Sequence, residues 1–455
     1  MSTDLADVGF IGLSSQSKDL ILNMNDKGFS VAVYSRNWAR AEDFLATEAQ
    51  GTNIRAITSL SEFVSQLKTP RKIFLKVMVG HAVDHFILQI REYLDPSDIL
   101  IDLANSNYLD TARRTRELEE RGLYFVGCGV GGGLEAARTG PCLSPGGSPY
   151  AWPAVQAILQ SMAAQVDGRP CCDWIAGGGA GHFVKTMQTG ILHSNMQLLA
   201  EAYEMLRRVL GLTEDEIAEI FATWNRGLLE SALLNLTVDI LKFKDDDGEA
   251  MVTKIMDRAG TKGAAKWAAV EALEHDVCFP ITTQAVFCRY LSWLKEDRVR
   301  ASRIFGDPPM ETFSGDKQAF VNDLEQAVYA SQVMLYCQTF GVMAAVPKNQ
   351  WTFNFQTIAH IWRGCLIAGD ILIHIGEAYK RTPQLEALIH HNFFRQAIER
   401  AQPGWRRSVS EAVIRGVSVQ CLSAALAYLD GYRSAVLPAN LVQALDTCAQ
   451  RGRVA

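Results

Sequence analysis

Short apolar runs alternate with helical segments over the first 170 or so residues, and this alternation limits the fold more than any other feature of the chain. A segment at 17–28 has the apolar spacing of a helix and stops at a glycine. The runs that have the length of buried strands lie at 7–12, 29–35, 72–79, 98–105 and 123–130. Strands separated by helices predict a parallel, doubly wound sheet, which is an α/β domain of the Rossmann type.

Long helical patterns take over from about residue 177, for example at 196–211 and 318–345, and no strand pattern accompanies them. A chain of 455 residues is long enough for two or three domains. We therefore expect a sheet domain at 1–176, a large all-helical domain at 177–433 and a short C-terminal tail at 434–455.

The charge and composition of the chain exclude several classes of partner. A net charge of -6 leaves no broad basic surface for nucleic acid. No apolar run approaches the roughly 20 residues that cross a bilayer, and the N-terminus lacks the basic region of a signal peptide. The spacing of the ten cysteines fits neither a disulfide scaffold nor a metal site. These features predict a cytoplasmic protein with a small-molecule substrate and no metal.

The first strand ends in a turn that has the position of a phosphate-binding loop. A dinucleotide-binding turn reads G-x-G-x-x-G, and here Gly12, Ser14 and Ser17 occupy its three glycine positions. The second strand ends without the acid that binds the ribose of NAD, and it offers Arg36 instead. An arginine there can bind the 2′-phosphate of NADP(H) through paired hydrogen bonds, although the same position also suits a solvated surface arginine.

A helical segment at 181–194 carries a single candidate base. Lys185, Gln188, Thr189 and Leu192 follow one another at the spacing of one helix face. Proton transfer on such a face calls for an acid or an imidazole. This face offers one lysine, two neutral polar groups and a leucine, so its chemistry is not explained by the residues alone.

The chain closely resembles the decarboxylating 6-phosphogluconate dehydrogenase family along nearly its full length. The matching stretches are LILNMNDKGF (20–29), PCCDW (170–174), GAGHFVK (179–185), GTKGAAKW (260–267), WRG (362–364), DGYR (430–433) and LPANL (437–441). The resemblance implies an NADP-binding domain, a large helical domain, and a tail that completes the partner's site in a homodimer. It also implies a reaction that oxidises a sugar acid at carbon 3, decarboxylates it, and reprotonates the enediol.

The resemblance assigns roles that this chain fills only in part. Lys185 matches the family's base, whereas Leu192 stands where the family has its acidic glutamate. Gln188 and Thr189 stand at a histidine and an asparagine, and Gly131, followed by Gly132, stands at a serine. The implied phosphate-binding positions fall on His193, Lys262 and Arg298.

Apolar side chains occupy several implied positions near the nicotinamide. They are Met78, Leu103, Leu134 and, from the helix, Leu192, while the family's Asn105 is kept. Because these replacements are all apolar, they favour a cleft that has been rebuilt for an apolar ligand. Relaxed constraint after a loss of activity is the other explanation for this pattern.

We therefore expect a chain that has lost the family's standard reaction. The favoured function is an NADP(H)-dependent oxidoreductase of specialised metabolism that acts on an apolar, unphosphorylated substrate with Lys185, Asn105 and His193 as its catalytic groups. A cofactor-independent isomerase, lyase or cyclase is one alternative. A non-catalytic partner of an active dehydrogenase is another.

Overall fold

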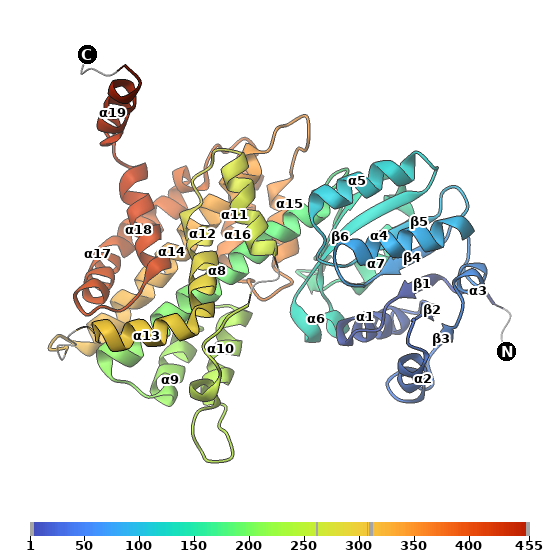
Figure 1. The fold of residues 1–455 in the computed structure, drawn as a ribbon, viewed down its shortest axis with the longest axis horizontal. Helices are drawn as coiled ribbons and strands as arrows, with labels where there is room; N and C mark the ends of the chain where they lie inside the picture. Colours follow the sequence, from blue (N-terminus) through green and yellow to red (C-terminus); the bar gives the residue numbers. More distant parts are fainter. Residues whose placement is uncertain (1–3, 261–262, 307, 309–312, 452–455) are drawn as a thin grey trace.

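The computed structural model describes residues 4–260, 263–306, 308 and 313–451. It has two parts, a sheet covered by helices and a larger body of helices, and a long helix joins them (Figure 1). In the described ranges, no helix combines the length and the apolar character needed to cross a membrane.

The sheet has seven strands in the order β3-β2-β1-β4-β5-β6-β7. They are β1 (Val8–Ile11), β2 (Val31–Tyr34), β3 (Ile54–Ile57), β4 (Lys72–Leu75), β5 (Ile99–Asp102), β6 (Tyr124–Gly131) and β7 (Cys142–Gly147). All pairings are parallel except that of β6 with β7. The predicted Rossmann-type sheet is confirmed. Two of its strands, β3 and the antiparallel β7, were not predicted.

Helices cover both faces of this sheet. They are α1 (Ser15–Asp26), α2 (Trp38–Ala46), α3 (Leu60–Ser65), α4 (His81–Ile90), α5 (Tyr108–Glu119), α6 (Gly133–Thr139) and α7 (Trp152–Met162), and a small hairpin of β8 (Gln165–Val166) and β9 (Arg169–Pro170) follows. Successive residues of a strand point to opposite faces of the sheet, so Phe10 packs in one apolar cluster and Ile11 in the other. Burial of both faces is why these strands read as continuous apolar runs.

The second part is helical throughout the residues that the structure describes. Its helices are α8 (Ala180–Leu210), α9 (Glu214–Trp224), α10 (Ala232–Lys242), α11 (Ala264–Glu274), α12 (Pro280–Trp293), α13 (Lys295–Phe305), α14 (Lys317–Ala345), α15 (Phe355–Trp362), α16 (Asp370–Arg381), α17 (Asn392–Ile414), α18 (Gln420–Tyr432) and α19 (Ala439–Arg451). The middle of helix α14 is buried around most of its circumference, between α8, α17 and α18. Helix α19 projects away from the body (Figure 1).

The first turn of α8 lies directly on the backbone of β6 and β7, and glycines make this approach possible. A Cβ atom at Gly181 would lie 2.3 Å from the carbonyl oxygen of Gly127 and 2.7 Å from the amide nitrogen of Gly146. A Cβ atom at Gly146 would in turn lie 2.6 Å from the amide nitrogen of Gly181. We call Gly127, Gly146 and Gly181 the glycine seam. It fixes α8 against the sheet one helical turn before Lys185.

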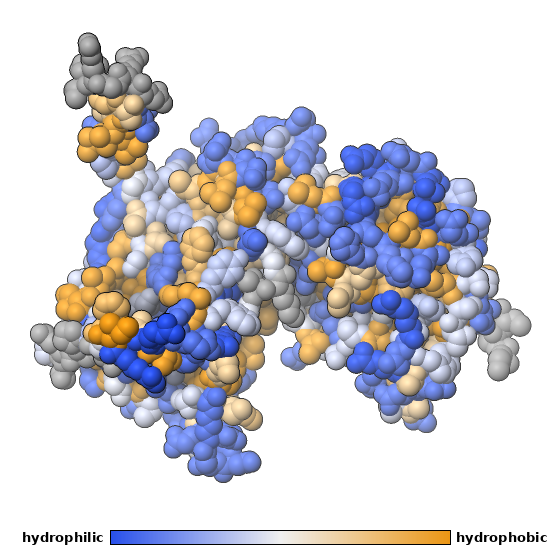
Figure 2. All heavy atoms as spheres, in the orientation of Figure 1, coloured by the Kyte–Doolittle hydropathy of each residue, from blue (hydrophilic) through white to orange (hydrophobic). Residues whose placement is uncertain are grey.

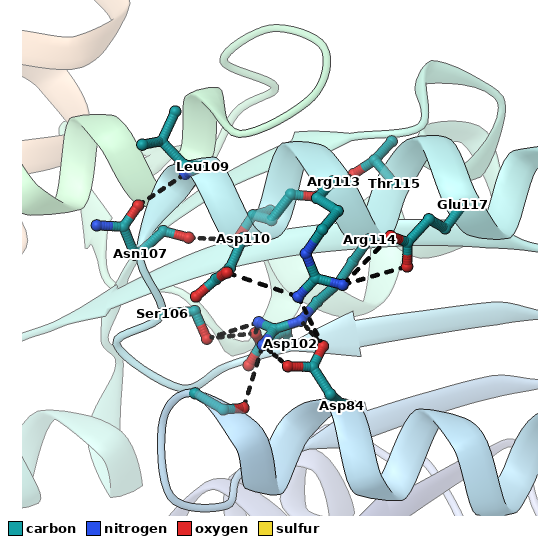
Figure 3. A network of polar contacts seen from close by, with 12 residues as sticks. Asp84, Asp102, Ser106, Asn107, Leu109, Asp110, Arg113, Arg114, Thr115 and Glu117 are labelled. Carbon is teal, nitrogen blue, oxygen red and sulfur yellow. Dashed lines mark hydrogen bonds and ion pairs between the residues drawn. The ribbon is translucent and has the colours of Figure 1, made fainter.

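A buried arginine ties the end of β5 to helices α4 and α5 (Figure 3). Arg114 is 1% exposed and donates to both carboxylate oxygens of Asp84 at 2.8 and 3.0 Å. The hydrogen bond from Arg114, more than the ones from Arg113, lowers the pKa of Asp84 to about 2. Arg114 also lies 3.6 Å from the fully buried carboxylate of Asp102. Asp102 accepts from Ser106, so the network holds the loop that follows β5.

Substitution in the glycine seam should be costly. Gly181→Ala forces a methyl group onto backbone atoms that cannot rotate away, and we expect the free energy of unfolding to fall by about 1–3 kcal/mol or more. Gly341→Ala on α14 is the matched control, because no atom lies within 4 Å of its added Cβ. It should raise the free energy of unfolding by about 1 kcal/mol, since alanine favours a helix. Urea unfolding followed by circular dichroism measures both, and a neutral Gly181→Ala would contradict the argument.

Loss of the buried arginine should also destabilise the sheet part. Arg114→Met leaves the carboxylate of Asp102 buried without its cation, which should cost about 3–5 kcal/mol. Arg113→Met removes a more exposed partner of the same Asp84 and should cost at most about 1 kcal/mol. If the two variants unfold at the same urea concentration, Arg114 does not have this role.

Candidate active site

A cavity of about 400 Å³ gathers polar side chains from both parts of the molecule. The sheet part contributes Gln16 from α1 and Asn105 from the loop after β5. The helical part contributes one face of α8 and the segment after α15. The lining residues are Gln16, Asn105, Val130, Gly132, Gly133, Lys185, Gln188, Thr189, Leu192, His193, Gly260, Ala264, Cys365, Leu366 and Ile367. The four predicted face positions of the helix therefore share one cavity.

Lys185 is the basic group of this cavity. Its Nζ donates to Oε1 of Gln188 at 2.7 Å. Surrounding protein atoms lower the pKa of Lys185 because they disfavour its charged form. An amine with a lowered pKa is neutral over a wider pH range, and a neutral amine can accept a proton from a bound molecule.

Gln188 connects Lys185 to two sulfur atoms. Its Nε2 donates to Sγ of Cys142 and to Sγ of Cys365, both at 3.1 Å. Gly131 leaves room for this arrangement, since a Cβ atom there would lie 2.5 Å from Sγ of Cys142 and 2.7 Å from Oε1 of Gln188. The glycine at this position therefore accommodates the glutamine, and Gly131 itself does not line the cavity.

The other two polar groups of α8 have different roles. The hydroxyl of Thr189 donates to the carbonyl oxygen of Lys185 at 3.0 Å, so it is bound within the helix. Burial, and then the cation of Arg289, lower the pKa of His193 to about 4. His193 is thus a neutral imidazole near pH 7, and its buried Nδ1 has no hydrogen-bond partner among the residues that the structure describes.

Most of the apolar residues predicted for the cleft lie elsewhere. Only Leu192 of the four expected apolar residues lines the cavity. Leu103 is 1% exposed and packs in the sheet core, because it continues the buried end of β5. Met78 and Leu134 are 80% and 57% exposed and do not line the cavity. The cavity has a mixed lining, in which Leu192, Val130 and Ile367 lie beside polar side chains.

The arginine beside the cavity is not the one predicted. Arg298 lies 3.0 Å from the carboxylate of Asp257 and also donates to the carbonyl oxygen of Ser292, so it serves a local ion pair. Arg289 instead donates to the carbonyl oxygen of Gly260, a cavity residue, at 2.6 Å and influences His193. The predicted Lys262 lies outside the described residues.

The turn after β1 has the geometry of an anion site at a helix N-terminus. Gly12 has a φ of +109°, and a Cβ atom there would lie 2.3 Å from the carbonyl oxygen of Lys76. Ser14 caps α1 by accepting from the amide of Ser17 at 3.2 Å. Ser17 is fully buried, and its hydroxyl lies 2.7 Å from that of Ser14. The serine at the third glycine position therefore fits between helix and strand, and the first turn of α1 has no acidic side chain to repel an anion.

Arg36 lies exposed at the end of β2, with its guanidinium 4.9 Å from the ring centroid of Phe86. Stacking on an aromatic ring orients the planar guanidinium while leaving its donors accessible. This arrangement suits a 2′-phosphate better than a freely moving surface arginine would.

Sequence reasoning missed three groups near the cavity in addition to Arg289. Cys142 and Cys365 come from distant segments, and nothing in their spacing indicates that they meet at Gln188. Lys76 donates to the carbonyl oxygen of Leu103 at 2.6 Å, and burial lowers its pKa to about 8. A lysine directly after a buried strand is the one signal that could have identified Lys76.

Family models match both parts of the chain. The model of the NAD binding domain of 6-phosphogluconate dehydrogenase matches residues 7–176, and the model of the 6-phosphogluconate dehydrogenase C-terminal domain matches residues 181–448.

Individual relatives match almost end to end. The human decarboxylating 6-phosphogluconate dehydrogenase is 46% identical over 96% of this chain and 92% of its own length. The enzyme of Schizosaccharomyces pombe is 47% identical over 97% of this chain and 90% of its own length. Among solved structures, the Plasmodium falciparum 6-phosphogluconate dehydrogenase aligns with a TM-score of 0.93 at 35% identity, and it covers 96% of this chain and 95% of the other.

This likeness corrects the expected function. Relatives with nearly half of their residues identical along almost the whole chain are decarboxylating 6-phosphogluconate dehydrogenases, and the fold match is equally complete. The expectation of a lost standard reaction and a new role on an apolar substrate in specialised metabolism is therefore wrong. It rested in part on Met78, Leu103 and Leu134, none of which lines the cavity. The chain belongs to the 6-phosphogluconate dehydrogenase family.

Proposed function

We propose that this protein oxidises and decarboxylates 6-phosphogluconate with NADP⁺ as the oxidant. The observation that carries the proposal is Lys185, a lysine with a lowered pKa that lies in a cavity shared by the dinucleotide turn and the helical part. The reaction named for the relatives at 46–47% identity supports it.

The residues of the sheet part fit NADP⁺. The left-handed Gly12 and the capped N-terminus of α1 suit a diphosphate, and Arg36 stacked on Phe86 suits the 2′-phosphate. Bound there, NADP⁺ would supply the hydride acceptor. Asn105 lines the cavity on the sheet side, where its amide can hold the nicotinamide end toward Lys185.

Lys185 acts as the base of the oxidation. Its neutral amine accepts the proton of the carbon 3 hydroxyl as the hydride leaves that carbon. The resulting ammonium returns the proton to the carbonyl oxygen as carbon dioxide departs, which stabilises the enediol that forms. Gln188 keeps the amine in place through its 2.7 Å contact.

The last proton transfer differs from the one that the resemblance implies. Leu192 has no proton to give, and the side chain of His193 is neutral near pH 7. We propose that water in the cavity protonates carbon 1 of the enediol. The neighbouring Arg289 provides a cation for the phosphate at the other end of the substrate.

We also infer a cytoplasmic homodimer. Helix α19 stands clear of the body, and its apolar side chains are exposed (Figures 1 and 2). Leu441, Val442 and Leu445 are each about 60% exposed, which is unfavourable unless a second copy covers them. All ten cysteines are free thiols, as is usual in a reducing compartment.

Turnover tests the proposed reaction directly. The purified protein should form NADPH from NADP⁺ and 6-phosphogluconate, measured by absorbance, and should release carbon dioxide. Lys185→Met should lower the rate by about 10²–10⁴-fold, while Lys68→Met, at an exposed ion pair with Asp7, should not change it. The rate should rise with pH as Lys185 loses its proton, with a midpoint below the ordinary 10.5 because its pKa is lowered. Absence of NADPH formation in the unmodified protein would overturn the proposal.

Cofactor choice can be tested separately from turnover. Arg36→Ala should weaken NADPH binding by about 1.5–3 kcal/mol, which is the usual contribution of hydrogen bonds to a charged group, and should leave NADH binding unchanged. Arg40→Ala is the control, since Arg40 is also exposed and follows shortly after on α2. Fluorescence titration measures both ligands. Equal losses for NADH and NADPH would mean that Arg36 does not contact the 2′-phosphate.

A further inference from the structure

Two thiols from distant segments meet beside Lys185. Cys142 begins β7, and Cys365 follows the end of α15. Both sulfur atoms lie 3.1 Å from the same nitrogen, Nε2 of Gln188. The distance between the two sulfurs therefore cannot exceed twice this value. Neither thiol has a role in the reaction described above.

The two thiols differ in their access to solvent. Cys142 is 1% exposed. Cys365 is partly exposed and lines the cavity, so a small molecule that enters the cavity reaches its sulfur first. The pair thus combines a thiol that is accessible from the cavity with a shielded thiol that lies close enough to react with it.

Their surroundings favour ionisation of one thiol of the pair. A hydrogen bond from Cys365 and the charge of Lys185 lower the pKa of Cys142 to about 7. Burial and the same hydrogen bond raise the pKa of Cys365, so the pair carries a single thiolate, at Cys142, and the thiolate is the form that reacts with oxidants.

We propose that Cys142 and Cys365 form a reversible disulfide when a peroxide enters the cavity, so that this pair is an oxidation site next to the catalytic lysine. In the first step the thiolate of Cys142 attacks hydrogen peroxide, the O–O bond breaks, and a sulfenic acid forms while the leaving hydroxide takes up the proton that the thiol had released and departs as water. In the second step the other thiol attacks this sulfur, the S–O bond breaks, the S–S bond forms, and a second water leaves. The two sulfurs together lose two electrons to the peroxide, and the two thiol protons end in water.

Disulfide formation would change what holds Lys185. Bonded sulfurs are about 2.05 Å apart, so at least one of them must move from its present position by the Gln188 amide. A disulfide sulfur also accepts a hydrogen bond less well than a thiolate. Gln188 then loses the contacts that orient it, and with them the fixed position of its Oε1 beside Nζ of Lys185.

This consequence for catalysis rests on the proposed function, but the bond itself does not. The full-length protein would be treated with hydrogen peroxide, the remaining thiols blocked by alkylation, and the peptides identified by mass spectrometry. We expect a linked pair of peptides that contain Cys142 and Cys365 and that separate after treatment with dithiothreitol. NADPH formation should fall at least tenfold with the bond and return with the reductant.

Single variants give the controls. Cys365→Ser and Cys142→Ser should each abolish the linked peptides and the peroxide sensitivity. Cys365→Ser is the safer variant, because its thiol is only partly buried. Cys337→Ser on α14 removes a thiol that is also partly exposed, and peroxide sensitivity should persist in it.

Three results would overturn the proposal. The first is that Cys142 and Cys365 both remain alkylated as free thiols after the peroxide treatment. The second is that Cys365 links to Cys171, whose sulfur would lie 3.0 Å from a Cβ atom at Gly364. The third is that the linked peptides form without any change in the turnover of an active enzyme. If the untreated protein has no turnover, the proposed function fails while the peptide map still decides whether the bond forms.

Discussion

The direct contact between the backbone of α8 and the backbone of β6 and β7 is the constraint on which the site depends. Side chains normally separate a helix from a sheet, and here the glycine seam has none. The helix therefore begins at the sheet surface and delivers Lys185 to the edge where Asn105 emerges. The remaining length of the same helix is buried among α11, α12 and α14, so one rigid element connects the sheet to the helical core.

The environment of Lys185 follows from that contact. Close approach to the sheet surrounds the lysine with protein atoms, and this lowers the pKa of its amine. A charged side chain in such a place is destabilising unless it is bonded, and Gln188 supplies the bond. In this chain the arrangement that lowers the pKa of the lysine thus includes a glutamine at the next turn of the helix and a glycine at position 131 that makes room for it.

Much of the fold could be predicted from the sequence, because buried parallel strands and long helices leave strong apolar patterns. Strand β7 escaped prediction because its sequence, CLSPGG, has the proline and glycines of a turn. The site was harder to predict. The sequence gives the position of Leu103 along the chain but not the direction of its side chain. A shift of one residue along an extended segment turns a side chain from the core toward the cavity. Arg289 was missed in favour of Arg298 for a similar reason, since only the folded helices show which arginine approaches Gly260.

The glycine seam also bears on how such enzymes can be recombined. The seam pairs Gly127 and Gly146, from the sheet part, with Gly181, from the first turn of the helical part. A chimera joined between residues 176 and 181 would combine two halves of this contact from different parents. A relative with a larger residue at any of the three positions would push the helix outward and carry Lys185 away from the sheet side of the cavity. Exchange of the dinucleotide-binding domain between family members therefore depends on matching three small residues more than on matching the surface around them.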